Sequence, residues 1–367
     1  MRIDAIIVTL HLTHGKDEKI EEYINAVAQE LLQNAEILSE RKITTVYFGG
    51  GTPSYIESKY IAKIMNIINM FESDIKEVTI EINPGTVTKD KLLEYKKAGI
   101  NRLSIGLQST HNEVLKLIGR IHTYEDFIST LNLAKEVGFT NISLDLMYPL
   151  PNLSLNGFKE SINDVINLKE KYDIKHISIY NLEIHENSRL EFLLKNGFVS
   201  LVDEDEEYEM KKYLEKTLKE NNFFRYEISN FASKGYESKH NLNYWKQGEY
   251  LGVGVAASSF ILGSRYTNTN NLENYIDCIN SGKNTLVEKE DLDKLDLMKE
   301  YVILSLRLEE GLNIAKFEKK FDTNIYDIFK HEINKLKKDE LIVVKNNCLR
   351  LSKRGKEVAN IVWEEFI

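Results

Sequence analysis

The chain has 367 residues, of which 42% are hydrophobic and 29% charged, and its net charge is −9. This length suits one large domain with a small second one. The acidic balance argues against a general nucleic-acid-binding protein, because phosphate contacts need clustered cations.

Two further features predict a cytoplasmic protein. No run of roughly eighteen apolar residues is present, so we expect no membrane span, and the apolar stretch from Ala5 to Leu10 is too short for a signal peptide. Cys278 and Cys348 are the two cysteines, far apart in the sequence. Lone thiols of this kind are typical of a reducing compartment, and they show no metal-ligand spacing.

Short β-rich runs alternate with helical patterns over the first two-thirds of the chain, which predicts parallel βαβ units. The pattern alone leaves an open sheet and a barrel as alternatives. In chain order the predicted elements are strand Thr44–Phe48, helix Ser58–Phe71, strand Glu77–Ile82, helix Lys89–Ala98, strand Arg102–Leu107, a helix within His122–Val137, strand Asn141–Met147, helix Phe158–Lys171, strand His176–Leu182, helix Glu204–Asn221 and strand Arg225–Ser229.

The C-terminal part has a different pattern, with three helices, a short β-hairpin and a last helix. This order is winged-helix-like, but a fold does not fix a function, and the acidic charge disfavours DNA binding. The predicted elements are helices Leu292–Leu308, Ile314–Phe321 and Ile325–Lys337, strands Leu341–Val344 and Leu349–Leu351, and helix Lys353–Phe366.

Polar residues follow or end five successive predicted strands, and in parallel β/α folds this end of the sheet carries the ligand site. The glycine run Gly49–Thr52 could direct backbone N–H groups at an anion, although an ordinary tight turn is an equal alternative. Its spacing fits neither a phosphate loop nor a dinucleotide fingerprint. The other polar residues are Glu81, Gln108, Asp145 and Asn181.

Each of these side chains also has a structural alternative. Glu81 and Asp145 lie in apolar strands and need partners, which a ligand or an internal ion pair could provide. Gln108 suits a ribose or an amino acid, but taken singly it is more often a loop amide. Arg120 could bind a carboxylate as a fork, although most exposed arginines are solvated surface charges.

The segment Lys239–Trp245 (KHNLNYW) offers a second candidate site. His240 could ligate heme iron, and Tyr244 and Trp245 could flank a planar ring. The alternative is a loop whose aromatic residues pack on the barrel. The stretch of small residues Gly252–Ser259 favours close packing of the backbone, and a surface on which a ligand rests is the alternative.

Five ordered motifs resemble the oxygen-independent coproporphyrinogen III oxidase-like family of radical S-adenosylmethionine (SAM) proteins. Two more segments, Tyr226–Ala232 and Lys239–Trp245, resemble the heme-chaperone branch of that family, and the resemblance covers about residues 15–367. The five motifs are Tyr47–Ser54, Glu81–Gly85, Arg102–Ser109, Gly119–His122 and Leu144–Pro151.

The resemblance implies a partial (β/α)6 TIM-like barrel, of class α/β, with a winged-helix-like C-terminal domain. It implies that the glycine loop takes the methionine amino group of SAM, that Arg120 takes its carboxylate and that Asp145 holds ribose hydroxyls, with His240 linked to heme. The implied role is to bind heme and pass it to acceptor proteins, which could be membrane-associated. The positions that match SAM contacts are Gly50, Gly51, Thr52, Glu81, Gln108, Arg120 and Asp145.

The N-terminus departs from the family. The family has three cysteines there that hold a 4Fe-4S cluster, whereas residues 1–14 contain none. We therefore expect no cluster, and without it no reductant for SAM cleavage. The predicted domains are an aberrant segment 1–14 in place of the cluster-binding strand and loop, a radical SAM barrel with its extension over 15–285, and the winged-helix-like domain over 286–367.

A reading shifted by one base through residues 1–14 can restore three cysteine codons, so we hypothesise a frameshifted gene start, with natural loss as the alternative. DNA sequencing of this region tests the idea, and it fails if no single-base shift restores the codons. Three functions remain open: a heme chaperone, an oxygen-independent coproporphyrinogen III oxidase of porphyrin biosynthesis, and a cluster-free interaction protein. Oxidase activity is not expected, and a homodimer is left open.

Overall fold

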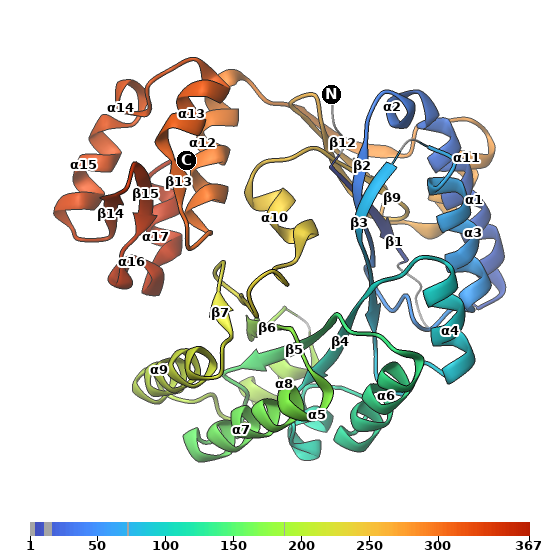
Figure 1. Cartoon of the computed structure of the whole chain (residues 1–367), viewed down its shortest axis with the longest axis horizontal. Helices are drawn as coiled ribbons and strands as arrows, with labels where there is room; N and C mark the ends of the chain where they lie inside the picture. The colour runs from blue at the N-terminus through green and yellow to red at the C-terminus, as the bar shows by residue number, and fades with distance from the viewer. Residues whose placement is uncertain (1–3, 11–16, 72, 187) are drawn as a thin grey trace.

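The computed structural model describes residues 4–10, 17–71, 73–186 and 188–367. One curved sheet of twelve described strands dominates it, in the order β12-β11-β10-β9-β1-β2-β3-β4-β5-β6-β8-β7 (Figure 1). Its first six strands in sequence run parallel to one another. They are β1 (Ala5–Thr9), β2 (Ile43–Gly49), β3 (Ser73–Ile82), β4 (Arg102–Gln108), β5 (Ile142–Tyr148) and β6 (His176–Asn181).

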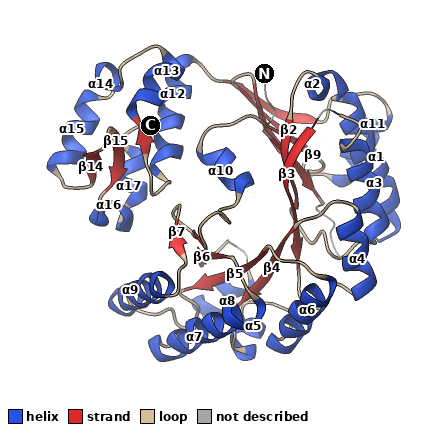
Figure 2. Ribbon diagram, in the orientation of Figure 1, coloured by secondary structure: helices blue, strands red, loops and turns tan. Residues whose placement is uncertain are grey.

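Helices cover the convex side of this sheet, as Figure 2 shows. Most strands from β1 to β6 are followed by a helix that returns the chain to the start of the next strand, which confirms the predicted α/β class and partial (β/α)6 architecture. The helices are α1 (Ile20–Gln33) after the 3-10 turn η1 (Asp17–Lys19), α2 (Ala35–Ser39), α3 (Ser58–Ile68), α4 (Lys89–Lys97), α5 (Asn112–Leu117), α6 (Tyr124–Val137), α7 (Leu155–Tyr172), α8 (Arg189–Lys195) and α9 (Glu204–Glu220).

Apolar and polar side chains alternate along the strands, so that apolar residues face the helices and polar residues face the concave side. In β3, Val78, Ile80 and Ile82 are buried in the main hydrophobic core, whereas Glu77 and Glu81 occupy the alternate positions and point to the concave face. Helix α6 shows why the helical predictions hold. A capping box of Thr123 and Asp126 begins it, and Gly138 in the left-handed conformation ends it.

Further strands extend the sheet at both edges. Strand β9 (Tyr250–Val253) pairs in parallel with β1, and β10 (Ser258–Ile261), β11 (Ser264–Asn268) and β12 (Leu286–Asp291) follow in antiparallel order. At the other edge, β8 (Asn230–Ala232) pairs with β6 and with β7 (Phe224–Arg225). Helix α11 (Leu272–Asn280) packs beside α1 on the outside, and α10 (Lys239–Trp245) lies on the concave side (Figure 1).

The predicted strand Arg225–Ser229 is wrong, because the chain turns within it and forms β7 and β8 on either side. One oxygen of the Glu227 carboxylate accepts hydrogen bonds from the Ser229 backbone N–H, at 3.1 Å, and from the Asn230 side-chain amide. The Tyr226 N–H donates to the Asn230 carbonyl oxygen at 3.1 Å. The carboxylate of Glu227 therefore accepts hydrogen bonds within a turn. The pattern of apolar residues in the sequence predicts an extended strand at this place.

The C-terminal domain has its own core, from Met298 to Phe366. The predicted helix Leu292–Leu308 is confirmed as α12. Strand β13 was missed by the prediction, and the predicted helices Ile325–Lys337 and Lys353–Phe366 are divided, at Phe329 and at Val358. Because β12 belongs to the large sheet, this core begins after the predicted boundary at 286. The elements are α12 (Lys294–Leu306), β13 (Leu312–Asn313), α13 (Ile314–Phe321), α14 (Ile325–Ile328), α15 (Lys330–Lys338), β14 (Ile342–Lys345), β15 (Cys348–Leu351), α16 (Lys353–Glu357) and α17 (Ala359–Glu364).

Two predictions concern the N-terminal segment and the membrane. Residues Ala5–Thr9 form β1, between β2 and β9, whereas residues 1–3 and 11–14 lie outside the described residues. Among the helices of the described ranges, none combines the length and apolar character needed to cross a membrane.

Candidate functional site

The concave face of the sheet is lined by polar side chains from five neighbouring strands. They occupy every second position of β2 to β6, opposite the apolar positions that face the helices. Burying so many polar groups together requires that they bond to one another or to a ligand. These residues are Thr45, Tyr47, Glu77, Thr79, Glu81, Arg102, Ser104, Ser143, Asp145, His176, Ser178 and Tyr180.

The glycine loop follows β2 and contacts the adjoining strands. Gly50 and Gly51 have φ values of 69° and 82°, and a Cβ atom on Gly50 would lie 2.6 Å from the Thr9 methyl carbon. Only glycine fits this close approach without strain. The Asn83 side-chain amide donates to Thr52 Oγ1 at 3.0 Å, so the glycine loop and the segment after β3 form one surface.

Glu81 lies beside this loop. The Tyr47 hydroxyl donates to Glu81 Oε1 at 2.8 Å, and the Gly50 N–H also bonds to this carboxylate. Burial raises the pKa of Glu81 to about 7, and the donated bond from Tyr47 partly opposes the rise. The nearby Asp145 carboxylate adds to it. Glu81 is therefore poised to accept a proton or a donor group near neutral pH.

Asp145 is held on β5 by serine hydroxyls from both neighbouring strands. Ser104 Oγ lies 3.2 Å and 3.1 Å from the two carboxylate oxygens, and Ser178 bonds from the other side. Burial raises the pKa of Asp145, whereas these hydrogen bonds and the charges of Arg102 and Arg120 lower it. Arg120 is therefore near Asp145, although it comes from the loop after α5.

Gln108 ends β4 with a φ of 64°. Its side-chain nitrogen would lie 2.8 Å from a Cβ atom on Gly106, which pairs with Asp145 in the sheet. The structure thus brings Gly50, Glu81, Arg120 and Asp145 together, with Thr52 and Gln108 at the margin through Asn83 and Gly106. Two carboxylates, a guanidinium and backbone N–H groups suit a ligand that carries both an amine and a carboxylate.

His240 lies in helix α10, whereas the structural alternative considered for this segment was a loop. The side chain is 2% exposed. Its Nδ1 lies 2.9 Å from Thr45 Oγ1 and its Nε2 lies 2.9 Å from the Tyr244 hydroxyl. Burial lowers the pKa of His240 to about 3, so the ring is neutral at ordinary pH. Iron ligation would require one of these two bonds to break, and it stays a prediction.

Sequence reasoning missed three residues of this face. Arg102 is 2% exposed, its Nε has no hydrogen-bond partner among the described residues, and its charge acts on Asp145 and His240. Tyr47 holds Glu81, and Glu77 accepts bonds from the start of α10. Strict alternation of polar and apolar residues in these strands was the signal that could have revealed them.

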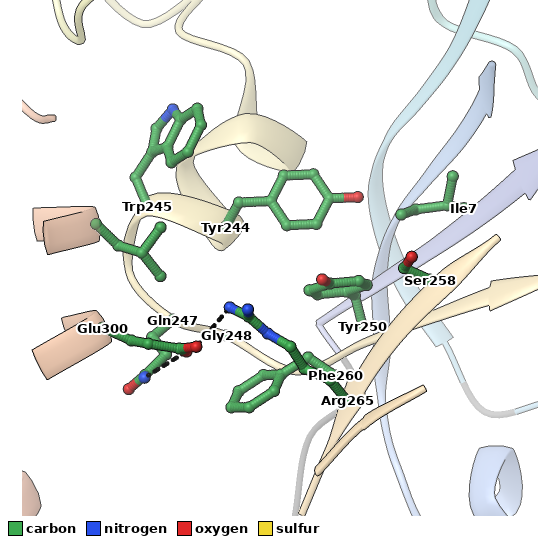
Figure 3. Close-up of a pocket in the computed structure, with 11 residues that line it drawn as sticks. Ile7, Tyr244, Trp245, Gln247, Gly248, Tyr250, Ser258, Phe260, Arg265 and Glu300 are labelled. Carbon is green, nitrogen blue, oxygen red and sulfur yellow. Dashed lines mark hydrogen bonds and ion pairs between the residues drawn. The ribbon is translucent and has the colours of Figure 1, made fainter. Parts of the chain in front are cut away.

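A cleft of about 900 Å³ lies between the barrel and the C-terminal domain. Its walls include Tyr180 of β6, Tyr244 and Trp245 of α10, and Trp363 of α17. A smaller cavity of about 290 Å³ adjoins α10 on the side of β9 and β10 (Figure 3). There the ring of Tyr250 lies edge-on to that of Tyr244, with 4.7 Å between ring centres, and Arg265 forms an ion pair with Glu300 at 2.7 Å.

The two cysteines of this sequence lie far apart in the structure. Cys278 is on α11 and Cys348 is on β15, in different domains, and both are free thiols. Within the described part of the chain, no three His, Cys, Asp or Glu side chains are grouped to hold a metal ion. Three thiolates at one site, which a 4Fe-4S cluster needs, are not available from two separated cysteines.

Comparisons with known proteins identify two regions of the chain. Residues 12–165 match the radical SAM superfamily and residues 292–358 match the HemN C-terminal domain. The fold resembles that of coproporphyrinogen III oxidase (HemN) from Escherichia coli, a radical SAM enzyme. The TM-score is 0.86 at 23% identity, over 100% of this chain and 90% of that one.

Two relatives are similar over almost their whole length. Heme chaperone HemW of Bacillus subtilis (strain 168) is 32% identical over 355 residues, which are 96% of this chain and 93% of the relative. Heme chaperone HemW of Buchnera aphidicola subsp. Schizaphis graminum is 33% identical over 351 residues, 95% and 90% of the two chains. With its radical SAM barrel and HemN-type C-terminal domain, the chain therefore belongs to the HemW family.

Proposed function

We propose that this protein binds heme and transfers it to acceptor proteins. The observation that carries the proposal is its near full-length similarity to relatives named heme chaperones. The cleft of about 900 Å³ supports it, because a cavity of this size with aromatic walls suits a large planar ligand.

Hemin titration followed by transfer tests the proposal. We expect a saturable change in the heme absorbance spectrum, and then movement of heme to an added apoprotein such as apomyoglobin. Hemin bound to bovine serum albumin serves as the reference for passive exchange. The absence of saturable heme binding, or transfer no faster than from albumin, would contradict the proposal.

His240 is the proposed iron ligand, since a neutral imidazole is the form that binds metal. His240→Ala should weaken hemin binding and change the position of the heme absorbance maximum. His185→Ala, which alters an exposed histidine, is the matched control. An unchanged spectrum in His240→Ala would remove His240 from the site.

SAM is the proposed second ligand, held at the concave face by Glu81, Arg120, Asp145 and the glycine loop. Asp145→Asn should lower SAM affinity about tenfold in calorimetry, because a carboxylate acceptor for hydroxyl groups is lost. Asp173→Asn, at an exposed helix end, is the control. Equal affinities in the two variants would place SAM elsewhere.

We also propose that the chain as written holds no 4Fe-4S cluster, because two separated cysteines cannot supply three thiolates. Anaerobic reconstitution with iron and sulfide should leave the spectrum without cluster absorbance, and a 4Fe-4S spectrum would refute this.

A cytoplasmic location is proposed from the two unpaired thiols. Acceptors at the membrane and a homodimer remain proposals that co-sedimentation with vesicles and size-exclusion chromatography can test.

A further inference from the structure

The wall of the large cleft contains an arginine in contact with two tryptophan rings. Arg307 directly follows α12, and its guanidinium carbon lies 4.4 Å from the ring centre of Trp245 and 4.8 Å from that of Trp363. Trp245 ends α10 and Trp363 belongs to α17, and all three residues line the cleft. Two cation–π contacts hold the guanidinium in place, and its terminal N–H groups can still donate hydrogen bonds.

Arg307 has no carboxylate partner within 4.0 Å among the described residues, and its buried Nε has no hydrogen-bond partner there. Other cations of the cleft differ. Arg225 forms an ion pair with Glu215 at 2.8 Å, and Lys356 forms one with Glu309 at 2.5 Å. Glu227 acts on Arg307 only from beyond ion-pair distance. Burying a guanidinium without a hydrogen-bond acceptor costs free energy, unless a bound ligand supplies the acceptor.

The neighbours of Arg307 carry further unsatisfied polar atoms. Within the described ranges, the indole N–H groups of Trp245 and Trp363 are buried without acceptors, and Glu227 Oε2 and Asn230 Oδ1 are buried without donors. All four residues line the same cleft. Because Arg307 Nε and both indole N–H groups are enclosed by protein, the donors that an anionic oxygen in the cleft can reach are the terminal nitrogens of Arg307.

We propose that Arg307 binds a carboxylate of the heme in this cleft, so that the Trp245–Arg307–Trp363 stack is the propionate subsite. The inference rests on the heme-binding function proposed above. Arginine's fork of donors matches a carboxylate in two parallel hydrogen bonds, which lysine cannot reproduce. The competing cation is Lys211 of α9, which also lines the cleft without an ion pair within 4.0 Å among the described residues.

The test compares hemin with hemin dimethyl ester, in which both carboxylates are neutral, by absorbance titration. The wild type should bind the ester at least about tenfold more weakly. Arg307→Met should bring the ratio of hemin affinity to ester affinity close to one, whatever its effect on the stability of the domain junction. Arg354→Met, which removes an exposed arginine of α16 outside the cleft, should behave like the wild type.

The possible outcomes separate this inference from the proposed function. Equal binding of hemin and ester by the wild type overturns the subsite without any variant, even if Arg307→Met does not fold. Discrimination that persists in Arg307→Met, or that disappears in Lys211→Met instead, also overturns it. If neither porphyrin binds the wild type, the heme-binding function itself fails. Arg307→Lys should recover only part of the discrimination, because it restores the charge without the fork.

Discussion

Among single residues, Glu81 shows how the concave face controls protonation. Burial raises its pKa from 4.5 to about 7, so the folded protein holds this proton more tightly than the unfolded chain. The stabilisation from the bound proton is complete below pH 4.5 and disappears as the pH rises through about 7. The buried carboxylate therefore lowers the free energy of unfolding of the wild type at neutral pH, and an uncharged side chain at this position would not.

Glu81→Gln should remove this destabilisation. We expect the free energy of unfolding of the variant, relative to the wild type, to increase between pH 4.5 and 7.5 by at most about 3 kcal/mol. Urea titrations at a series of pH values measure it. Glu113→Gln on the exposed surface of α5 should show no such trend, and a flat difference for Glu81→Gln would mean that its carboxyl is not perturbed.

The fold leaves no room for a side chain at position 254, which is a glycine. It has a φ of 105°, and a Cβ atom there would clash with the Thr9 carbonyl oxygen and lie 2.6 Å from the Tyr23 hydroxyl. Gly254→Ala should lower the free energy of unfolding by about 3 kcal/mol, from strain and overpacking together. Gly235→Ala, with a φ of 88° and no atom within 4 Å, isolates the backbone strain and should cost only about 1 kcal/mol. Equal losses would show that the clash is relieved.

Among the elements, α10 depends on a carboxylate far away in the sequence. Glu77 of β3 accepts hydrogen bonds from the backbone N–H groups of Lys239, at 3.1 Å, and His240, at 3.0 Å, and from the Ser238 hydroxyl at 3.3 Å. These N–H groups begin the helix and have no partner within it. Glu77 therefore fixes α10, and with it His240, on the concave face.

Glu77→Gln should destabilise the protein by about 2 kcal/mol, because the amide directs a donor at groups that are themselves donors. Thermal unfolding measures this loss. Hydrogen exchange at Lys239 and His240 should accelerate more than exchange in α3, which shares no contact with Glu77. Unchanged exchange at α10 would mean that the helix holds without this carboxylate.

The same elements show what sequence can predict and what it cannot. Strands β2 to β6 and helix α6 were predicted because alternation, capping residues and Gly138 act within a few residues of one another. Helix α10 was not predicted, since the carboxylate that begins it is 162 residues away from Lys239. The turn at Glu227 was missed because a side chain replaces the strand pairing there.

The candidate site follows the same division. The positions of Glu81 and Asp145 could be predicted, because carboxylates in apolar strands are conspicuous. Which side chains bond to these carboxylates could not be predicted, since strand register decides which side chains meet across a sheet. Here the partners are Tyr47, Ser104 and Ser178.

For the whole molecule, two separate hydrophobic cores meet at a junction that includes the Arg307 stack. The chain has two tryptophans, and both belong to this stack. Intrinsic tryptophan fluorescence therefore reports on the junction, whereas circular dichroism reports on all helices and strands.

Arg307→Met should uncouple the two domains, since it removes two cation–π contacts of about 1 kcal/mol each. We expect the fluorescence transition to move to lower temperature and to precede the loss of helical signal. In Arg354→Met the two signals should change together, as in the wild type. Coincident transitions in Arg307→Met would show that other contacts dominate the junction.

The two faces of the large sheet carry separate tasks. Apolar residues under the helices form the main hydrophobic core, while the polar residues on the concave face bond to one another and to α10. A substitution on the inside that keeps these bonds would therefore leave the apolar packing on the outside unchanged. Ligand preference on this scaffold can thus change without a change in its outer shell.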